Sequence, residues 1–339
     1  MTLSRQDAEG RADPPLVALT GATGFIGRHL VVALHRAGFR LRLLLRREPD
    51  VPEWRGLPAP EVVAGALDDE AALDRLVEGA DVVIHLAGLI KAARRRDFFA
   101  VNRDGAAAMA RAVERVAPGA RFVLVSSLAA REPQLSDYAA SKRAGEGAVL
   151  EVLGERASVL RPSVVYGPGD RETLVFFQLA AGRLVPLLGS AEARAAMIHV
   201  ADLVRLIVAM ARAPGTGAEV RSAADDRPQG YTWEELLGAA ARAVGNAAPR
   251  FVRAPRALLG GVALVGDLAK LFGSSSMISS QKLRELRHPD WGVAAAERAT
   301  APGWAAQFDL ERGFADAVAW YRQAGWLPAS RGTGRASVG

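Results

Sequence analysis

Apolar and polar positions follow two alternating patterns through the first half of the chain. Short apolar runs are each followed by a segment in which apolar residues recur at helical spacing, as Ile26, Leu30 and Leu34 do. Repeated strand–helix units of this length are typical of a parallel sheet covered by helices on both faces. Because crossovers between parallel strands are right-handed, the predicted fold class is α/β with a doubly wound parallel sheet. The predicted strands are 16–19, 39–45, 61–64, 81–87, 121–126 and 158–160, and the predicted helices are 26–37, 71–77, 102–116 and 138–153.

The pattern loosens after residue 161, where short strands and helices alternate irregularly and Pro and Gly become frequent. We therefore expect a first domain over 14–165 and, over 166–329, a smaller C-terminal substrate lobe of which some segments return to the first domain. Residues 1–13 are polar and charged and are expected to form a disordered lead-in. The small and polar residues 330–339 are expected to be a frayed tail.

The composition excludes several kinds of site. The 339 residues contain no Cys, which excludes disulfides, thiolate metal sites and a cysteine nucleophile. The five His show no ligand spacing, so we predict no metal. The net charge is +6, but the basic residues are dispersed except for Lys91 and the run 94–96, and we predict no nucleic-acid binding. The basic run is interpreted as a solvated face, with guidance of an anionic substrate or lipid headgroup as the alternative.

Membrane contact is expected at most at the surface of a bilayer. No stretch approaches the ~20 apolar residues needed to span one, and residues 1–13 lack the apolar core of a signal peptide. We therefore expect a cytoplasmic protein. The apolar segment 255–272 has basic residues beside it and reads either as a buried helix or as a lipid-gripping helix at the inner membrane surface.

Residues 20–27, Thr-Gly-Ala-Thr-Gly-Phe-Ile-Gly, follow the first predicted strand and begin the first predicted helix. Gly21, Gly24 and Gly27 allow the backbone to bend tightly and approach a phosphate, and the free N–H groups of the helix start face the anion. This turn therefore predicts a dinucleotide pyrophosphate site. Its spacing is GxxGxxG, not the GxGxxG of the commonest dinucleotide fold.

A second candidate constellation consists of Tyr138, Lys142 and Ser127. Tyr138 and Lys142 are four residues apart on a predicted helix and share one of its faces. A phenol with its usual pKa near 10 needs roughly 4 kcal/mol of preferential phenolate stabilisation to titrate about three units lower, and a neighbouring ammonium contributes to it. Ser127 follows a predicted strand, at the sheet edge where ligands of parallel sheets bind, and could hydrogen-bond a substrate carbonyl. The alternative interpretation is that this serine only caps a loop.

Taken together, these motifs resemble the short-chain dehydrogenase/reductase superfamily, specifically its extended branch of NAD(P)-dependent epimerases and dehydratases. Residues 85–88, 101–105, 161–170, 198–203 and 231–233 are also similar to that branch. The resemblance implies a Rossmann-like fold, with Tyr138 as catalytic acid/base, Ser127 orienting a carbonyl and Lys142 at the nicotinamide ribose. The cofactor-binding residues that it implies are Gly21, Thr23, Gly24, Phe25, Ile26, Gly27, Arg46, Arg47, Leu67, Leu86, Ala87, Gly88, Asn102, Tyr138, Lys142, Pro162 and Val164.

The residues after the second predicted strand indicate which nicotinamide cofactor binds. An acidic residue there would bind the ribose 2′-OH of NAD, whereas this chain has Arg46 and Arg47. Because Arg pairs bidentately with a phosphate, we predict NADP(H) in preference to NAD(H), with Arg28 as a further candidate contact. One departure from the family pattern is Gly65-Ala66-Leu67, which lacks the usual Asp near the adenine.

The residues directly after Ser127 narrow the type of reaction. Leu128-Ala129-Ala130 carries none of the acidic residues that the dehydratases and decarboxylases of this branch use there. The C-terminal lobe is similar to the part of the family that contains the complex I accessory subunit and a bacterial reductase of oxidised ceramide. The resemblance therefore implies an NADPH-dependent reductase of a ketone on a lipid-like substrate, with conversion of 3-oxoceramide to dihydroceramide in bacterial sphingolipid synthesis as the leading expectation. A nucleotide-sugar epimerase and a non-catalytic NADPH-binding assembly subunit are the alternatives, and a homodimer through 102–116 and 138–153 is also implied.

Overall fold

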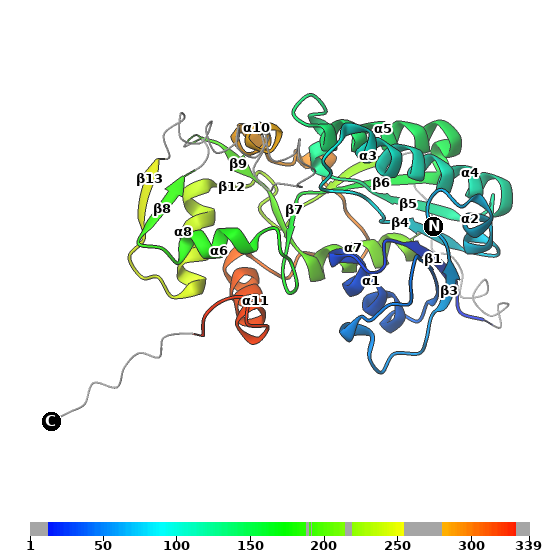
Figure 1. Cartoon of the computed structure of the whole chain (residues 1–339), viewed down its shortest axis with the longest axis horizontal. Helices are drawn as coiled ribbons and strands as arrows, with labels where there is room; N and C mark the ends of the chain where they lie inside the picture. The colour runs from blue at the N-terminus through cyan, green and yellow to red at the C-terminus, as the bar shows by residue number, and fades with distance from the viewer. Residues whose placement is uncertain (1–12, 188–189, 191, 214–218, 254–279, 330–339) are drawn as a thin grey trace. The chain divides into compact units, whose positions relative to one another are not determined.

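The computed structural model describes residues 13–187, 190, 192–213, 219–253 and 280–329 (Figure 1). The expectations for 1–12, 255–272 and 330–339 lie outside these residues. Contacts divide the chain into two units. The first comprises Met1–Arg161, Val204–Arg221 and Ala301–Trp304, and the second comprises Pro162–Leu203, Ser222–Thr300 and Ala305–Gly339.

A seven-stranded sheet forms the centre of the first unit. Its strands are β1 (Leu16–Thr20), β2 (Arg40–Leu45), β3 (Glu61–Ala64), β4 (Val82–His85), β5 (Arg121–Val125), β6 (Ala157–Pro162) and β11 (Glu219–Ala223). They lie in the order β11-β6-β5-β4-β1-β2-β3, and every pairing from β6 to β3 is parallel. This order confirms the predicted doubly wound, Rossmann-like α/β fold. It places the switch point of the topology between β1 and β4, where such sheets bind ligands beyond their carboxyl ends.

Helices cover both faces of this sheet (Figure 1). The helices are α1 (Phe25–Arg36), α2 (Glu70–Val77), α3 (Arg95–Phe99), α4 (Ala106–Val116) and α5 (Asp137–Leu153). Leu73, Met109 and Val149 of α2, α4 and α5 pack on one face, against alternate residues of the strands such as Val83 and Phe122. These side chains are almost fully buried, and so are alternate strand residues such as Leu19, Leu43 and Ile84, so the sheet is apolar on both sides, as its continuous apolar runs predicted.

The helix predicted over 102–116 begins earlier in the structure. Helix α3 starts at Arg95 and continues through a π-helical stretch, Ala100–Gly105, into α4. The sequence concealed this start because Arg94 precedes the helix with no side-chain cap and the next residues are charged. Single π-helical turns within α-helices are frequent at functional sites.

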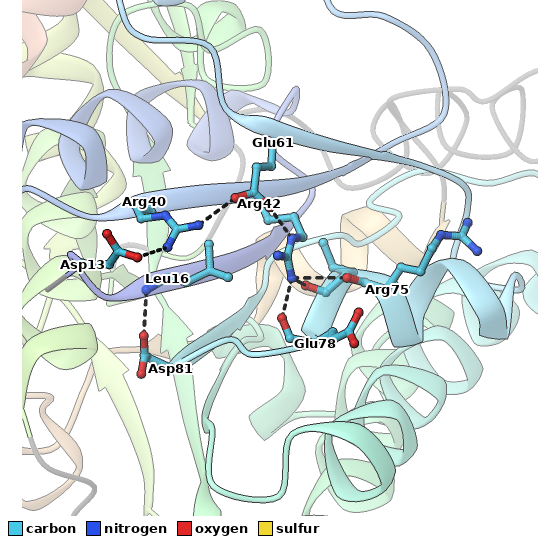
Figure 2. Close-up of polar contacts among 9 residues, drawn as sticks. Asp13, Leu16, Arg40, Arg42, Glu61, Arg75, Glu78 and Asp81 are labelled. Carbon is cyan, nitrogen blue, oxygen red and sulfur yellow. Dashed lines mark hydrogen bonds and ion pairs between the residues drawn. The ribbon is translucent and has the colours of Figure 1, made fainter. Parts of the chain in front are cut away.

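The amino ends of the strands, opposite to the predicted site, are joined by a polar network that Figure 2 shows. The Arg42 guanidinium donates to the Glu61 carboxylate at 2.7 Å and to the backbone carbonyl of Glu78 at 2.5 Å. The backbone N–H of Leu16 donates to the Asp81 carboxylate at 2.8 Å. The Arg42 bonds connect β2 with β3 and the end of α2, and the Leu16 bond connects β1 with the residue before β4.

The second unit contains shorter elements around its own core. Its strands are β7 (Val164–Tyr166), β8 (Leu184–Leu187), β9 (Arg194–Ala195), β10 (Met197–His199), β12 (Tyr231–Thr232), β13 (Arg250–Arg253) and β14 (Asp290–Trp291). Its helices are α6 (Leu174–Ala180), α8 (Trp233–Val244), α10 (Ser280–Arg287) and α11 (Leu310–Gln323), and α7 (Val200–Arg212) starts in this unit and ends in the first. The rings of Tyr166, Phe177 and Phe314 meet edge to face in the core. His199 is buried, and its ring stacks on that of Phe308 with centroids 3.9 Å apart. Over the described part of the chain, no helix is both long and apolar enough to cross a bilayer.

Candidate functional site

Two glycines of the turn after β1, Gly21 and Gly27, stand where a side chain would collide with the backbone. Gly21 has a φ of +77°, and a Cβ at this position would lie 2.6 Å from the backbone nitrogen of Ala87. A Cβ on Gly27 would lie 2.1 Å from the carbonyl oxygen of Gly21. Both distances are far below van der Waals contact. The turn is therefore pressed against the end of β4 and against the first turn of α1.

The start of α1 is suited to an anion. Gly24 precedes the helix, no side chain caps its first N–H groups, and no acidic residue lies in its first turn. Thr23 and Gly24 are exposed, while Phe25 and Ile26 are half-buried. Uncapped N–H groups and the positive end of the helix dipole favour a phosphate at this position. A cradle that a Cβ would fill, next to an uncapped helix, fits the pyrophosphate of a dinucleotide.

His85 and Thr20 join the two strand ends on either side of the switch point. The Thr20 hydroxyl lies 2.9 Å from Nδ1 of His85 and accepts from the backbone N–H of Ala87 at 3.2 Å. Complete burial, and next the charge of Lys142, lower the pKa of His85 to about 3, so its ring is neutral. Both residues lie within motifs identified in the sequence, but residue type and spacing indicated no role for either of them. Leu86 and Ala87 are half-buried, and the hydrogen bonds of Thr20 with His85 and Ala87 hold them beside Gly21.

Arg46 and Arg47 are exposed directly after β2, at the carboxyl edge of the sheet. Arg28 is already paired, because its guanidinium lies 3.3 Å from the Glu53 carboxylate. Leu67 follows β3 and packs against Gly105, where a Cβ would lie 2.7 Å from its side chain. Two exposed guanidinium groups at the end of β2 are therefore available for a phosphate.

Ser127 and Tyr138 lie at opposite ends of the short connection between β5 and α5. The Ser127 hydroxyl accepts from the backbone N–H of Ala129 at 3.2 Å and so caps a single 3₁₀ turn, as the loop-cap interpretation expects. Because the hydroxyl acts only as acceptor in this bond, its own proton stays available to a ligand. The Ser136 hydroxyl caps α5 by accepting from the backbone N–H of Ala139. The Tyr138 ring is half-buried and packs on Phe98 of α3, with ring centroids 6.3 Å apart.

Lys142 is buried beneath the site. Only 7% of its surface is exposed, and its ammonium donates to the carbonyl oxygen of Val125 at 3.0 Å. Burial lowers its pKa to about 8, while the Glu146 carboxylate acts in the opposite direction. A Cβ on Gly88 would lie 3.5 Å from the ammonium nitrogen, so the backbone of Gly88 lies next to the ammonium.

Asn102 connects the loop after β4 with helix α5. Its side-chain amide exchanges two hydrogen bonds with the backbone of Leu89, at 2.8 and 3.0 Å, and also donates to the Ser141 hydroxyl at 2.9 Å. Ser141 in turn donates to the carbonyl oxygen of Tyr138 at 2.8 Å. The carbonyl of Asn102, in the π-helical stretch, faces Gly145, where a Cβ would lie 2.1 Å away. The amide of Asn102 thus sets the position of the loop that contains Gly88, and its proposed cofactor contact stays a prediction.

The structure brings together most of the predicted residues of the first unit. The turn 21–27, the segment 86–88, Asn102 and Lys142 are linked by the contacts given above. Pro162 is buried at the end of β6, and Val164 begins β7, with 38% of its surface exposed; both belong to the second unit. Their role at a cofactor stays a prediction.

Comparisons with known proteins agree with this geometry. The model of the NAD dependent epimerase/dehydratase family matches residues 17–222. A protein of Caulobacter vibrioides named ceramide reductase is 51% identical over 92% of this chain and 96% of its own length. A mitochondrial NADH dehydrogenase 1 alpha subcomplex subunit 9 of Dictyostelium discoideum is 27% identical over 64% of this chain and 60% of its own length. The solved structure of the Bordetella bronchiseptica enzyme WbmH in complex with NAD+ aligns over 92% of this chain and 99% of its own, with a TM-score of 0.64 and 20% identity, and supports the fold.

The chain belongs to the NAD-dependent epimerase/dehydratase family, the extended short-chain dehydrogenases/reductases, and is an NAD(P)-dependent oxidoreductase of that type. The expected relationship to the complex I subunit and to the bacterial ceramide reductase is confirmed as a similarity of sequence.

Proposed function

We propose that this protein is an NADPH-dependent reductase of a ketone on a hydrophobic, lipid-like substrate, and that the substrate is 3-oxoceramide, reduced to dihydroceramide. The observation that carries the proposal is the 51% identity, over nearly the whole chain, to a relative named ceramide reductase. The chain keeps Ser127, Tyr138 and Lys142, which a reductase needs and a silent cofactor-binding subunit does not.

In the proposed reaction, Tyr138 donates its phenolic proton to the oxygen of the carbonyl while Ser127 holds that oxygen through its free hydroxyl proton. A bound nicotinamide supplies the hydride for the carbonyl carbon. Lys142, fixed by its bond to the carbonyl of Val125, supplies the positive charge that stabilises a phenolate on Tyr138. The segments 21–27 and 86–88 hold the cofactor against this group.

Preference for NADPH is part of the proposal. Arg46 and Arg47 are exposed at the end of β2, where an acidic residue would select NAD. A carboxylate at this position would repel a 2′-phosphate, whereas a guanidinium pairs with it. The Asp69 side chain, just before α2, does not add to the selection between NAD and NADP, because it is engaged as the cap of that helix.

The test is an NADPH-oxidation screen of the purified full-length protein. Long-chain keto-lipids, including 3-oxoceramide in mixed micelles, are compared with UDP-sugars, and products are identified by mass spectrometry. The proposal expects oxidation of NADPH with 3-oxoceramide and formation of dihydroceramide. Interconversion of a UDP-sugar without net redox change would establish an epimerase instead, and tight NADPH binding with no ketone reduced would establish an assembly subunit. Contact of 255–272 with the inner membrane surface and homodimer formation remain proposals that accompany this function.

A further inference from the structure

A buried carboxylate lies behind the predicted catalytic group. Glu146 follows Lys142 by one helical turn on α5, and only 1% of its surface is exposed. An ionised carboxylate at this depth is stable only when it is paired and hydrogen-bonded. The groups that pair with the Glu146 carboxylate therefore indicate the role of its charge.

The partners of Glu146 come from two neighbouring strands and from its own helix, where the Arg143 guanidinium lies 3.9 Å from the carboxylate. Arg161 of β6 donates to its two oxygens from Nε at 2.8 Å and from a terminal nitrogen at 2.6 Å, which is a bidentate pair. The Ser126 hydroxyl, at the end of β5, donates to it at 2.6 Å. Ser126 immediately precedes Ser127, so the carboxylate connects the strand end that carries Ser127 with the helix that carries Tyr138 and Lys142.

The same carboxylate sets the electrostatic environment of Lys142. The titratable groups that interact with the ammonium are Glu146 on its own helix, itself paired with Arg161 of β6, and His85 on β4. His85 is neutral at physiological pH, so Glu146 is the anion that opposes the effect of burial on Lys142. A buried ammonium without such an anion would lose its proton near neutral pH.

We propose that Glu146 is a positioning residue of the site: it keeps Lys142 protonated at physiological pH and, through Ser126 and Arg161, aligns the end of β5 with α5. The inference rests on the proposed function for the consequence of this charge in catalysis. It deepens that function because it assigns the protonation state of the Lys142 ammonium to a residue that touches neither substrate nor cofactor.

The test measures Lys142 directly and needs no substrate. The chain has four Lys, at 91, 142, 270 and 282, so lysine labelled with 13C at Cε yields four NMR signals, and that of Lys142 is assigned by its loss in Lys142→Arg. Glu146→Gln should lower the pH midpoint of the Lys142 signal by about one unit or more. Glu151→Gln makes the same change at an exposed position of the same helix and should leave the midpoint at the wild-type value.

A second variant keeps the test decisive where Glu146→Gln does not fold because Arg161 is left buried and unpaired. Glu146→Gln/Arg161→Gln removes both charges, a change that buried ion pairs often tolerate. The midpoint of Lys142 should again fall, but by less than in Glu146→Gln, because the repulsion from Arg161 is removed together with the attraction to Glu146. A midpoint equal to that of the wild type in a folded variant would overturn the proposal.

Activity gives the second measurement. The alkaline limb of kcat/KM for NADPH, with 3-oxoceramide as the ketone, should move to lower pH by the same amount as the NMR midpoint. A purely structural role of Glu146 would lower kcat at every pH without moving the limb, and that result would also overturn the proposal. Failure of the proposed function is distinguishable, because no ketone would then be reduced while the NMR shift would still be present.

Discussion

The ammonium of Lys142 donates a hydrogen bond to the backbone carbonyl of Val125, with 3.0 Å between nitrogen and oxygen. This bond fixes a buried cation at the carboxyl end of β5, two residues before Ser127. Because an ammonium has three donors, the bond to Val125 leaves others for a ligand. Helix α5 and the strand that precedes Ser127 are therefore joined through the charged group itself.

Replacement of Tyr138 by Phe should remove the proton donor and leave the cofactor site intact. We expect turnover with 3-oxoceramide to fall by about 10²-fold or more, since general acid catalysis by a positioned side chain contributes about that much. Steady-state rates and NADPH fluorescence titration measure the two effects separately. Near-normal turnover in a folded Tyr138→Phe protein would remove this residue from the mechanism.

The activity should depend on pH through Lys142. Burial lowers the pKa of this residue to about 8, so the ammonium is present below pH 8 and is lost above it. We therefore expect kcat/KM for NADPH, which reports the free enzyme, to be level below about pH 8 and to decline about tenfold per unit above it. In Lys142→Arg the cation persists, because a guanidinium does not titrate in this range, and the decline should move beyond about pH 10. A limb that remains near pH 8 in Lys142→Arg would assign it to another group.

Cofactor preference should depend on the two guanidinium groups after β2. A charge-assisted hydrogen bond contributes about 1.5–3 kcal/mol, so Arg46→Ala or Arg47→Ala should raise the KM for NADPH about tenfold or more. The KM for NADH should stay constant, because NADH lacks the 2′-phosphate. Arg111→Ala, which removes an exposed charge from α4, is the matched control. Equal kcat/KM values for NADH and NADPH in the wild type would contradict the preference.

Two glycines of α5 should respond to Ala in opposite directions. A Cβ at Gly145 would lie 2.1 Å from the carbonyl oxygen of Asn102, so Gly145→Ala should cost about 1–3 kcal/mol of unfolding free energy and displace the π-helical stretch. Gly147 is exposed and a Cβ there meets nothing within 4 Å, so Gly147→Ala should stabilise the protein by about 0.5–1 kcal/mol. Urea denaturation of both variants measures the difference. An equally stable Gly145→Ala protein would show that the two backbones need not approach so closely.

The strand–helix periodicity was sufficient to predict the doubly wound sheet, because each element buries an apolar face that is visible as a local repeat. The helix start at Arg95 was missed, because neither a cap nor an apolar period marks it. The same limit applies to Thr20 and His85. Each of the two residues belongs to an apolar strand, and their contact spans 65 positions of the chain.

Residue types at short spacing were enough to identify the glycine turn and the pair Tyr138 and Lys142, because a turn and a helical repeat are local geometries. The environment of that pair was decided by the tertiary structure. Arg161 reaches Glu146 from 15 positions away, and Asn102 reaches Ser141 from 39. Parallel pairing of β4, β5 and β6 brings these residues together against helix α5. Burial at this position lowers the pKa of Lys142, and residue spacing in the sequence carries no information about that burial.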